Sequence, residues 1–153
     1  MSTTTQNAVE RVFPDVLRTA AYSFGEACDK TELTYPEAGL FGRIQFSGHS
    51  TGKVFMAAPK ALAAELAANA LGLDAGDPEA SVHAEDAYRE LLNMVCGNLL
   101  TTWSGAEPVF DLCPPEVEPL NQKTWQELIS NPDTQAFLVD STHPVALLFT
   151  VSR

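Results

Sequence analysis

The sequence predicts an α+β fold, in which one mainly antiparallel β-sheet is covered by helices. Two pairs of short runs rich in β-branched and aromatic residues flank turn residues at 47–52 and 141–143, and they indicate two β-hairpins. The longest helical pattern in the chain lies at residues 81–104. No linker-like stretch interrupts the 153 residues, so we expect a single domain over residues 1–153.

The N-terminal half predicts a helix, a hairpin and a second helix. Apolar residues recur at helical spacing from Phe13 to Cys28, which indicates an amphipathic helix. The stretch LFGRIQFSGHSTGKVFMAAP contains two β-rich runs around SGHSTG and predicts a hairpin. Pro59 begins the second helix, PKALAAELAANALG, which we expect to end at a capping glycine, Gly72. The following LDAGDPEAS has the composition of a loop.

The C-terminal third predicts strands around one short helix. PVFDLCPPEV indicates a strand that stops at Pro114 and Pro115, because proline has no amide hydrogen to donate to a sheet. KTWQELI predicts one or two helical turns. TQAFLVD and PVALLFTV flank STH and predict a closing hairpin with one face on the core. Because PVALLFTV carries no charge, we expect it to form a sheet edge that needs covering.

The charge of the chain argues against nucleic acid as a partner. The formal net charge is −11, and the nine basic residues are scattered along the sequence. The N-terminal MSTTTQNAVERVF lacks the basic and apolar regions of a secretory signal. No apolar run has the length needed to cross a bilayer. We therefore expect a cytoplasmic protein that does not insert into membranes.

The cysteines and histidines do not indicate a metal or disulfide site. The three cysteines, Cys28, Cys96 and Cys113, form no CxxC pair, and their number is odd. The three histidines are far apart in the sequence. We expect the chain to have no metal site and no cofactor of its own.

The long helix has an apolar arc and an opposite polar face. At about 100° per residue, the arc contains Tyr88, Leu92, Val95, Leu99 and Trp103. Six residues lie opposite and are called the polar stripe below: Asp86, Glu90, Asn93, Met94, Gly97 and Thr101. A polar helix face usually meets only water. Here, however, Asn93 and Gly97 are weak helix formers that together cost about 1.5 kcal/mol relative to alanine. A solvated face does not need the notch that Gly97 leaves one turn after Asn93.

The residues of the stripe match a known family. DAYRELLNMVCGNLL, followed about twenty residues later by Pro114 and Pro115, resembles the CheC/CheX/FliY family of response-regulator phosphatases. The family motif is an Asp or Ser, three residues, a Glu, two residues, an Asn, and a Pro beyond the helix; Asp86, Glu90, Asn93 and Pro115 fill these positions. The first helix has no such Glu and Asn pair, so the sequence is similar to the single-site, CheX-like branch.

The resemblance implies an activity and a partner. It implies hydrolysis of the aspartyl phosphate on a receiver domain, usually CheY. It assigns Glu90 to the receiver's active-site lysine and Asn93 to orienting the attacking water. The receiver would supply Mg²⁺, so that this chain needs no cofactor.

The resemblance, together with the positions of residues around the long helix, also implies lesser roles for the residues near Glu90 and Asn93. We expect Asp86, Met94, Gly97 and Thr101 to contact the partner, with Met94 exposed, and Pro114 and Pro115 to be structural. A homodimer that pairs through the sheet is also implied. Two alternatives remain open: a non-catalytic receiver-binding or flagellar adaptor module, and a structural domain whose stripe only faces solvent.

Overall fold

The computed structural model describes residues 3–21, 23–74 and 76–152, apart from the side chains of residues 3, 4, 20 and 21. The strands are β1 Gly25–Cys28, β2 Gly39–Ser47, β3 Thr51–Pro59, β4 Asp111–Leu112, β5 Glu116–Pro119, β6 Gln135–Val139 and β7 His143–Ser152. The helices are α1 Thr3–Ala21, α2 Lys60–Leu71, α3 Pro78–Val82, α4 Ala84–Ser104 and α5 Gln122–Ser130, with a 3-10 turn at Lys30–Glu32.

In the described part of the chain the seven strands form one sheet in the order β1-β6-β7-β3-β2-β4, with β5 also paired to β2. Every strand pair is antiparallel. The predicted hairpins are β2–β3 and β6–β7, and Gly72 ends α2 in the left-handed conformation at φ 69°. The predicted α+β fold is confirmed.

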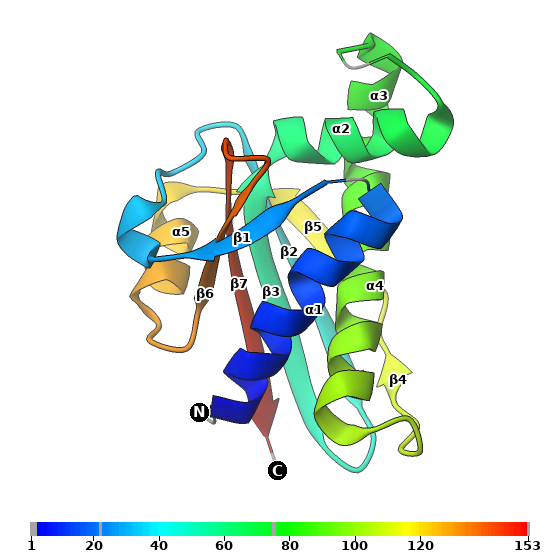
Figure 1. Ribbon diagram of the computed structural model, residues 1–153, viewed down its shortest axis with the longest axis vertical. Coiled ribbons are helices and arrows are strands. Elements are labelled where there is room, and N and C mark those ends of the chain that lie inside the picture. Colours follow the sequence, from blue (N-terminus) through cyan, green and yellow to red (C-terminus); the bar gives the residue numbers. More distant parts are fainter. Residues whose placement is uncertain (1–2, 22, 75, 153) are drawn as a thin grey trace.

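Helices cover both faces of the sheet. In Figure 1, α1 and α4 lie side by side over one face, and α2 crosses one end of it. Their apolar residues and the inward side chains of β2, β3 and β7 form the main core, which includes Phe13, Ile44 and Leu92. The other face carries a smaller core in which Trp125 and Leu128 of α5 pack with residues of β3 and β7. No helix in the described residues has both the length and the apolar character that a membrane span requires.

The first helix is shorter than predicted. It ends at Ala21, while Cys28 lies in β1 and the side chain of Phe24 is 67% exposed. The reason is a pair of long-range hydrogen bonds between Phe24 and Asp140. The Phe24 amide donates to Asp140 Oδ1 at 2.9 Å, and the Asp140 amide donates to the Phe24 carbonyl at 2.7 Å. These bonds direct the chain into the sheet, where β1 pairs with β6.

The predicted helix at 81–104 is two helices, and part of the predicted loop before it is helical. α3 has its own N-terminal cap, because Asp77 accepts from the Glu79 amide at 2.9 Å and Pro78 occupies the first turn. α3 ends at Val82 with His83 as its C-cap, and α4 begins at Ala84. α3 therefore forms a separate projection at the start of α4 (Figure 1).

The two prolines interrupt a strand rather than end it. β4 and β5 lie on either side of Pro114 and Pro115, and both pair with β2. Proline cannot donate to a sheet, so pairing stops there and starts again where Glu116 meets Arg43. The predicted short helix is confirmed as α5, whose Asn121 side chain accepts from the Thr124 amide at 2.8 Å.

The prediction that residues 144–151 form a sheet edge is wrong for the first half of the run and holds only for the second half. β7 pairs with β6 along residues 143–147 and with β3 along residues 146–152, so that residues 148–152 pair on the β3 side alone. Consecutive residues Val145, Ala146, Leu147, Leu148 and Phe149 are all buried, since α5 covers the face opposite the main core. The uncharged run reflects burial on two faces. The outer strands of the sheet are β1 on one side and β4 and β5 on the other.

Tyr88 fixes α4 on the sheet. Its hydroxyl donates to the Met56 carbonyl at 2.8 Å, and the Leu40 carbonyl lies at 3.4 Å. Burial raises the pKa of the Tyr88 hydroxyl above its ordinary value, which keeps it protonated as a donor. The ring lies over Gly42, where a Cβ atom would be 3.0 Å from Tyr88 Cε2 and from Leu92 Cδ2. Glycine on β2 thus lets the helix approach closely.

We expect Tyr88→Phe to lower the free energy of unfolding by about 1–2 kcal/mol, because it removes a buried hydrogen bond while keeping the ring. Urea denaturation of the variant and the parent measures this. Tyr35→Phe is the matched control, since the Tyr35 hydroxyl makes a longer bond of 3.3 Å in a half-buried place. A Tyr88→Phe protein as stable as the parent would contradict a supporting role for this bond.

Candidate functional site

Glu90 and Asn93 lie on the solvent side of α4, opposite the buried arc. The side chain of Glu90 is exposed and that of Asn93 is half-buried. Three residues apart on a helix, they are neighbours on one face. Among the described residues, neither side chain has a hydrogen-bond or ion-pair partner. A carboxylate and an amide are therefore available together to an external molecule.

Asp86 has a local partner. Its carboxylate lies 3.1 Å from Arg89 Nη1, and Arg89 Nη2 also lies 3.6 Å from Glu85. Both acids are in the first turn of α4, where negative charge is favourable at the positive end of the helix dipole. The ion pairs are exposed, so their contribution to stability is small. Asp86 is one turn before Glu90 on the polar stripe.

Gly97 leaves a gap in the helix surface. A Cβ atom built there meets nothing within 4 Å, so packing inside the protein does not require glycine at this position. The Thr101 hydroxyl donates to the Gly97 carbonyl at 3.1 Å and lies at one border of the gap. Met94 differs from the expectation, since its side chain is half-buried and packs against the main core.

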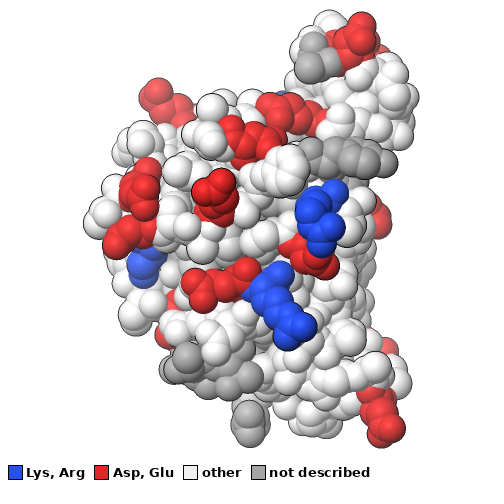
Figure 2. Space-filling model, viewed as in Figure 1, with Lys and Arg blue, Asp and Glu red and all other residues white. Residues whose placement is uncertain are grey.

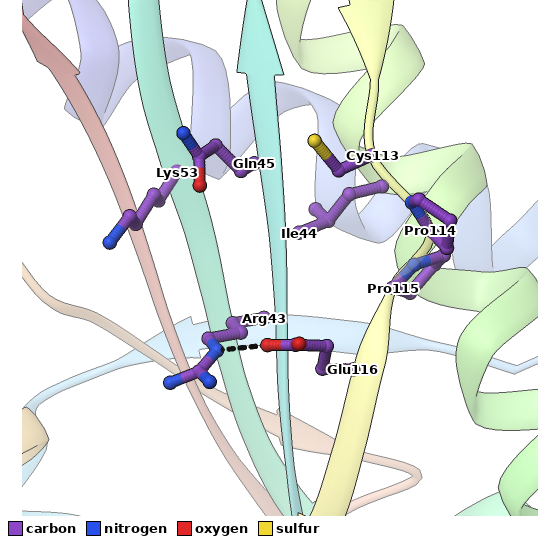
Figure 3. Close-up of a pocket in the computed structure, with 8 residues that line it drawn as sticks. All are labelled: Arg43, Ile44, Gln45, Lys53, Cys113, Pro114, Pro115 and Glu116. Atoms are coloured by element: carbon purple, nitrogen blue, oxygen red, sulfur yellow. Dashed lines mark hydrogen bonds and ion pairs between the residues drawn. The ribbon is translucent and has the colours of Figure 1, made fainter.

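Pro114 and Pro115 lie in the segment that runs beside α4, and they border a hollow of about 530 Å³ (Figure 3). The other lining residues are Arg43, Ile44, Gln45, Lys53, Cys113 and Glu116. Arg43 Nε donates to Glu116 Oε1 at 2.6 Å. No residue of the polar stripe lines this hollow. Glu90 and Asn93 thus lie outside this hollow on a helix surface, which suits contact with a partner protein better than enclosure of a small molecule.

The cysteines offer no activated thiol at the stripe. Cys96 is buried in α4, and burial raises the pKa of its thiol to about 12. Cys113 is exposed and lines the same hollow as Pro114 and Pro115. Within the described residues, no three side chains of His, Cys, Asp or Glu are placed to hold a metal ion.

Sequence reasoning missed an apolar hollow beside the start of the stripe. It has a volume of about 200 Å³ and is lined by Ala67, Ala70, Leu71, His83, Asp86 and Ala87. The composition of residues 73–81 indicates a loop, and this hides the position of α3. The available signal was Asp77 followed by Pro78, a typical helix start.

Charge on the surface is mainly negative. On the face in Figure 2, the described Lys and Arg side chains lie among more numerous Asp and Glu side chains. This agrees with the net charge of −11. The free groups of the stripe itself are one carboxylate, Glu90, and one neutral amide, Asn93, so a cationic group is the natural partner for its charged end.

Comparison with known proteins identifies the fold. CheX from Vibrio vulnificus matches with a TM-score of 0.66 at 18% identity, covering 98% of this chain and 100% of that chain. A chain of the CheX–CheY–BeF3–Mg²⁺ complex from Borrelia burgdorferi matches with a TM-score of 0.65 at 16% identity, covering 96% and 97%. CheX from Desulfovibrio desulfuricans matches with 0.63 at 15% identity, covering 95% and 99%. At such identities the likeness shows a shared fold.

No curated protein sequence matches the chain. A family model does: the model described as "Chemotaxis phosphatase CheX" matches residues 40–128, which is more than half of the sequence. The matched region contains the whole polar stripe and both prolines. The chain therefore belongs to the CheX family.

Proposed function

We propose that this chain, as a single CheX-like domain over residues 1–153, hydrolyses the aspartyl phosphate of a CheY-like receiver domain in the cytoplasm. Glu90 pairs with the active-site lysine of the receiver. Asn93 enters the receiver's pocket and orients the attacking water. Asp86, Met94, Gly97 and Thr101 belong to the surface on which the receiver docks.

The observation that carries the proposal is the pair of free side chains on α4 in a protein of the CheX family. Glu90 and Asn93 have no described partner, share one helix face, and are followed one turn later by the gap at Gly97. Tyr88 and the buried arc hold the backbone beneath them. Groups held on a rigid helix are suited to catalysis that depends on position.

The chemistry requires little from this chain. Phosphoryl transfer passes through a loose transition state in most analyses, so aligning the water matters more than removing its proton. The Asn93 amide oxygen accepts a hydrogen bond from that water, and the amide nitrogen donates to an oxygen nearby. A hundredfold acceleration of an already labile acyl phosphate corresponds to about 2.7 kcal/mol, which correct placement of one reactant is able to supply.

Mg²⁺ belongs to the receiver in this proposal. The related complex from Borrelia burgdorferi contains CheX, CheY, BeF3 and Mg²⁺ together. The ion would neutralise charge on the phosphoryl oxygens. Glu90 then needs only to meet the receiver's lysine, and its single negative charge and exposed position allow that contact.

A non-catalytic adaptor is the competing function. The same stripe could dock a receiver, or a flagellar component, without accelerating hydrolysis, because fold alone does not define function. The two functions differ in one measurement. A phosphatase shortens the lifetime of the phosphorylated receiver at substoichiometric amounts, whereas an adaptor binds the receiver and leaves that lifetime unchanged.

We expect Glu90→Ala and Asn93→Ala each to reduce receiver dephosphorylation to nearly the spontaneous rate. Both side chains point away from the core, so the free energy of unfolding should change by less than about 0.5 kcal/mol. Phosphate release from a phosphorylated receiver is the measurement. Asn98→Ala is the matched control, because Asn98 is an exposed amide on the same helix that bonds to the Met94 carbonyl. Parent-like release by either stripe variant would refute the assigned roles.

We expect Gly97→Leu to melt no lower than the parent but to dephosphorylate the receiver far more slowly. The new side chain enters open space, and leucine is a better helix former than glycine. It would hold the receiver away from Asn93, and misplacement by about 1 Å costs on the order of a hundredfold when catalysis is positional. Titration of a beryllofluoride-bound receiver separates weaker binding from slower chemistry. Unchanged affinity and turnover would show that the gap has no function.

We also expect a homodimer that pairs through the sheet, as the family resemblance implies. The candidate edges are β1, the side formed by β4 and β5, and residues 148–152 of β7, which extend beyond β6. Light scattering coupled to gel filtration should give twice the mass of one chain at micromolar concentration. A single-chain mass that does not change with concentration would exclude the dimer.

A further inference from the structure

We propose that the corner formed by the end of α2 and by α3 is a second contact surface for the receiver, one that takes an apolar side chain of that partner. The inference rests on the proposed function and deepens it. Leu71, Val82 and the 200 Å³ hollow beside Asp86 make up this surface, called the apolar corner below.

Two large apolar side chains are exposed at this corner. Val82, the last residue of α3, is 73% exposed, and Leu71, the last residue of α2, is 51% exposed. An isolated exposed apolar residue is ordinary on a protein surface. Here Leu71 lines an apolar hollow, and Val82 is followed directly by His83, which lines the same hollow. Exposed apolar surface beside a concave site is typical of an interface.

The corner is continuous with the polar stripe. Asp86 lines the hollow and is also the first residue of the stripe. Glu90 follows Asp86 by four residues, which is about 6 Å along the helix axis. A receiver that brings its lysine to Glu90 therefore has surface within reach of the corner.

The size of a stable interface supports the same conclusion. A specific protein complex buries about 800 Å² on each partner, far more than two side chains provide. The docked surface must extend from Glu90 and Asn93 over neighbouring parts of the molecule. The polar stripe supplies few apolar groups, since Met94 packs half-buried against the core. The apolar corner supplies such groups on the α2 side of α4.

The corner is held rigidly. Ala80 of α3 packs with Ala67 and Ala68 of α2 in a separate buried cluster. The Asp77 side chain caps α3 by accepting from the Glu79 amide. Val82 is thus presented by a fixed short helix rather than by a free loop, and little entropy is lost when a partner covers it.

The corner and the stripe should act on different kinetic constants. The corner does not reach the phosphoryl group, so it stabilises the bound receiver and the transition state equally. Such uniform binding changes KM and Kd but leaves kcat unaltered. Glu90 and Asn93, in contrast, act at the reacting atoms.

The test compares Val82→Ser, Leu71→Ser and the double variant with the parent, using a purified CheY-like receiver from the same source. We expect the double variant to raise Kd for the beryllofluoride-bound receiver and KM for the phosphorylated receiver at least tenfold, with kcat unchanged. Val109→Ser is the matched control, because Val109 is 83% exposed and lies beyond the C-terminal end of α4. It should behave as the parent does.

Each other outcome would refute the corner as a contact surface, the proposed function, or both. Parent-like Kd and KM in the double variant, or an equal loss in Val109→Ser, would overturn the corner as a contact surface. If Leu71→Ser lowers the melting temperature, Val82→Ser alone carries the test because its side chain is mostly exposed. A parent that binds the receiver without accelerating hydrolysis would refute the proposed function, while the Kd comparison would still decide the corner. A parent that does neither would refute both.

Discussion

The close seating of Tyr88 over Gly42 determines how α4 lies on the sheet, and the rest of the site depends on it. The Tyr88 hydroxyl donates to the Met56 carbonyl at 2.8 Å, which ties the helix to β3. The ring lies where a side chain on Gly42 would otherwise stand, with a Cβ contact of only 3.0 Å. A helix held at one such point, with a buried arc on either side of it, cannot rotate about its axis without breaking the bond and the packing together.

This fixed rotation explains why the stripe needs no other support. At about 100° per residue, Glu90 lies about 200° from Tyr88 and Asn93 lies about 140° from it. Both side chains therefore point away from the sheet whenever Tyr88 points into it. The backbone beneath them is part of the main core, where Leu92, Val95 and Leu99 are buried. A carboxylate and an amide are consequently held in one mutual arrangement without hydrogen bonds of their own, and those bonding groups stay free for a partner.

Features that depend on neighbouring residues in the sequence were predicted, whereas features that depend on pairing between distant segments were not. The apolar arc and the stripe of α4 were predicted because a period of 3.6 residues repeats over several turns. The segment Phe24–Cys28 was misassigned because its pairing partner, Asp140, is more than a hundred residues away. The edge predicted at residues 144–151 was wrong for its first half for the same reason, since pairing with β6 is not a local property. The prolines correctly predicted a stop, but the renewed pairing of Glu116 depends on Arg43. Open space at Gly97 was predictable because glycine in a helix interior is visible in the sequence, and its role in docking stays a prediction.

The open position of Glu90 and Asn93 on α4 determines how activity and selectivity are divided in the proposed function. Glu90 and Asn93 line neither the hollow beside the prolines nor the one beside Asp86, so in this proposal the water and the phosphoryl group meet Asn93 only inside the receiver's pocket. The rate then depends on how accurately the two proteins dock, and accuracy comes from surfaces beyond the reacting groups. Such surfaces are able to differ between family members while Glu90 and Asn93 stay the same. The open space at Gly97 and the apolar corner at Leu71 and Val82 are positioned on either side of the pair along α4. Selection among receivers would therefore depend on contacts at these two places. The rate of hydrolysis would depend on Glu90 and Asn93, which lie between them.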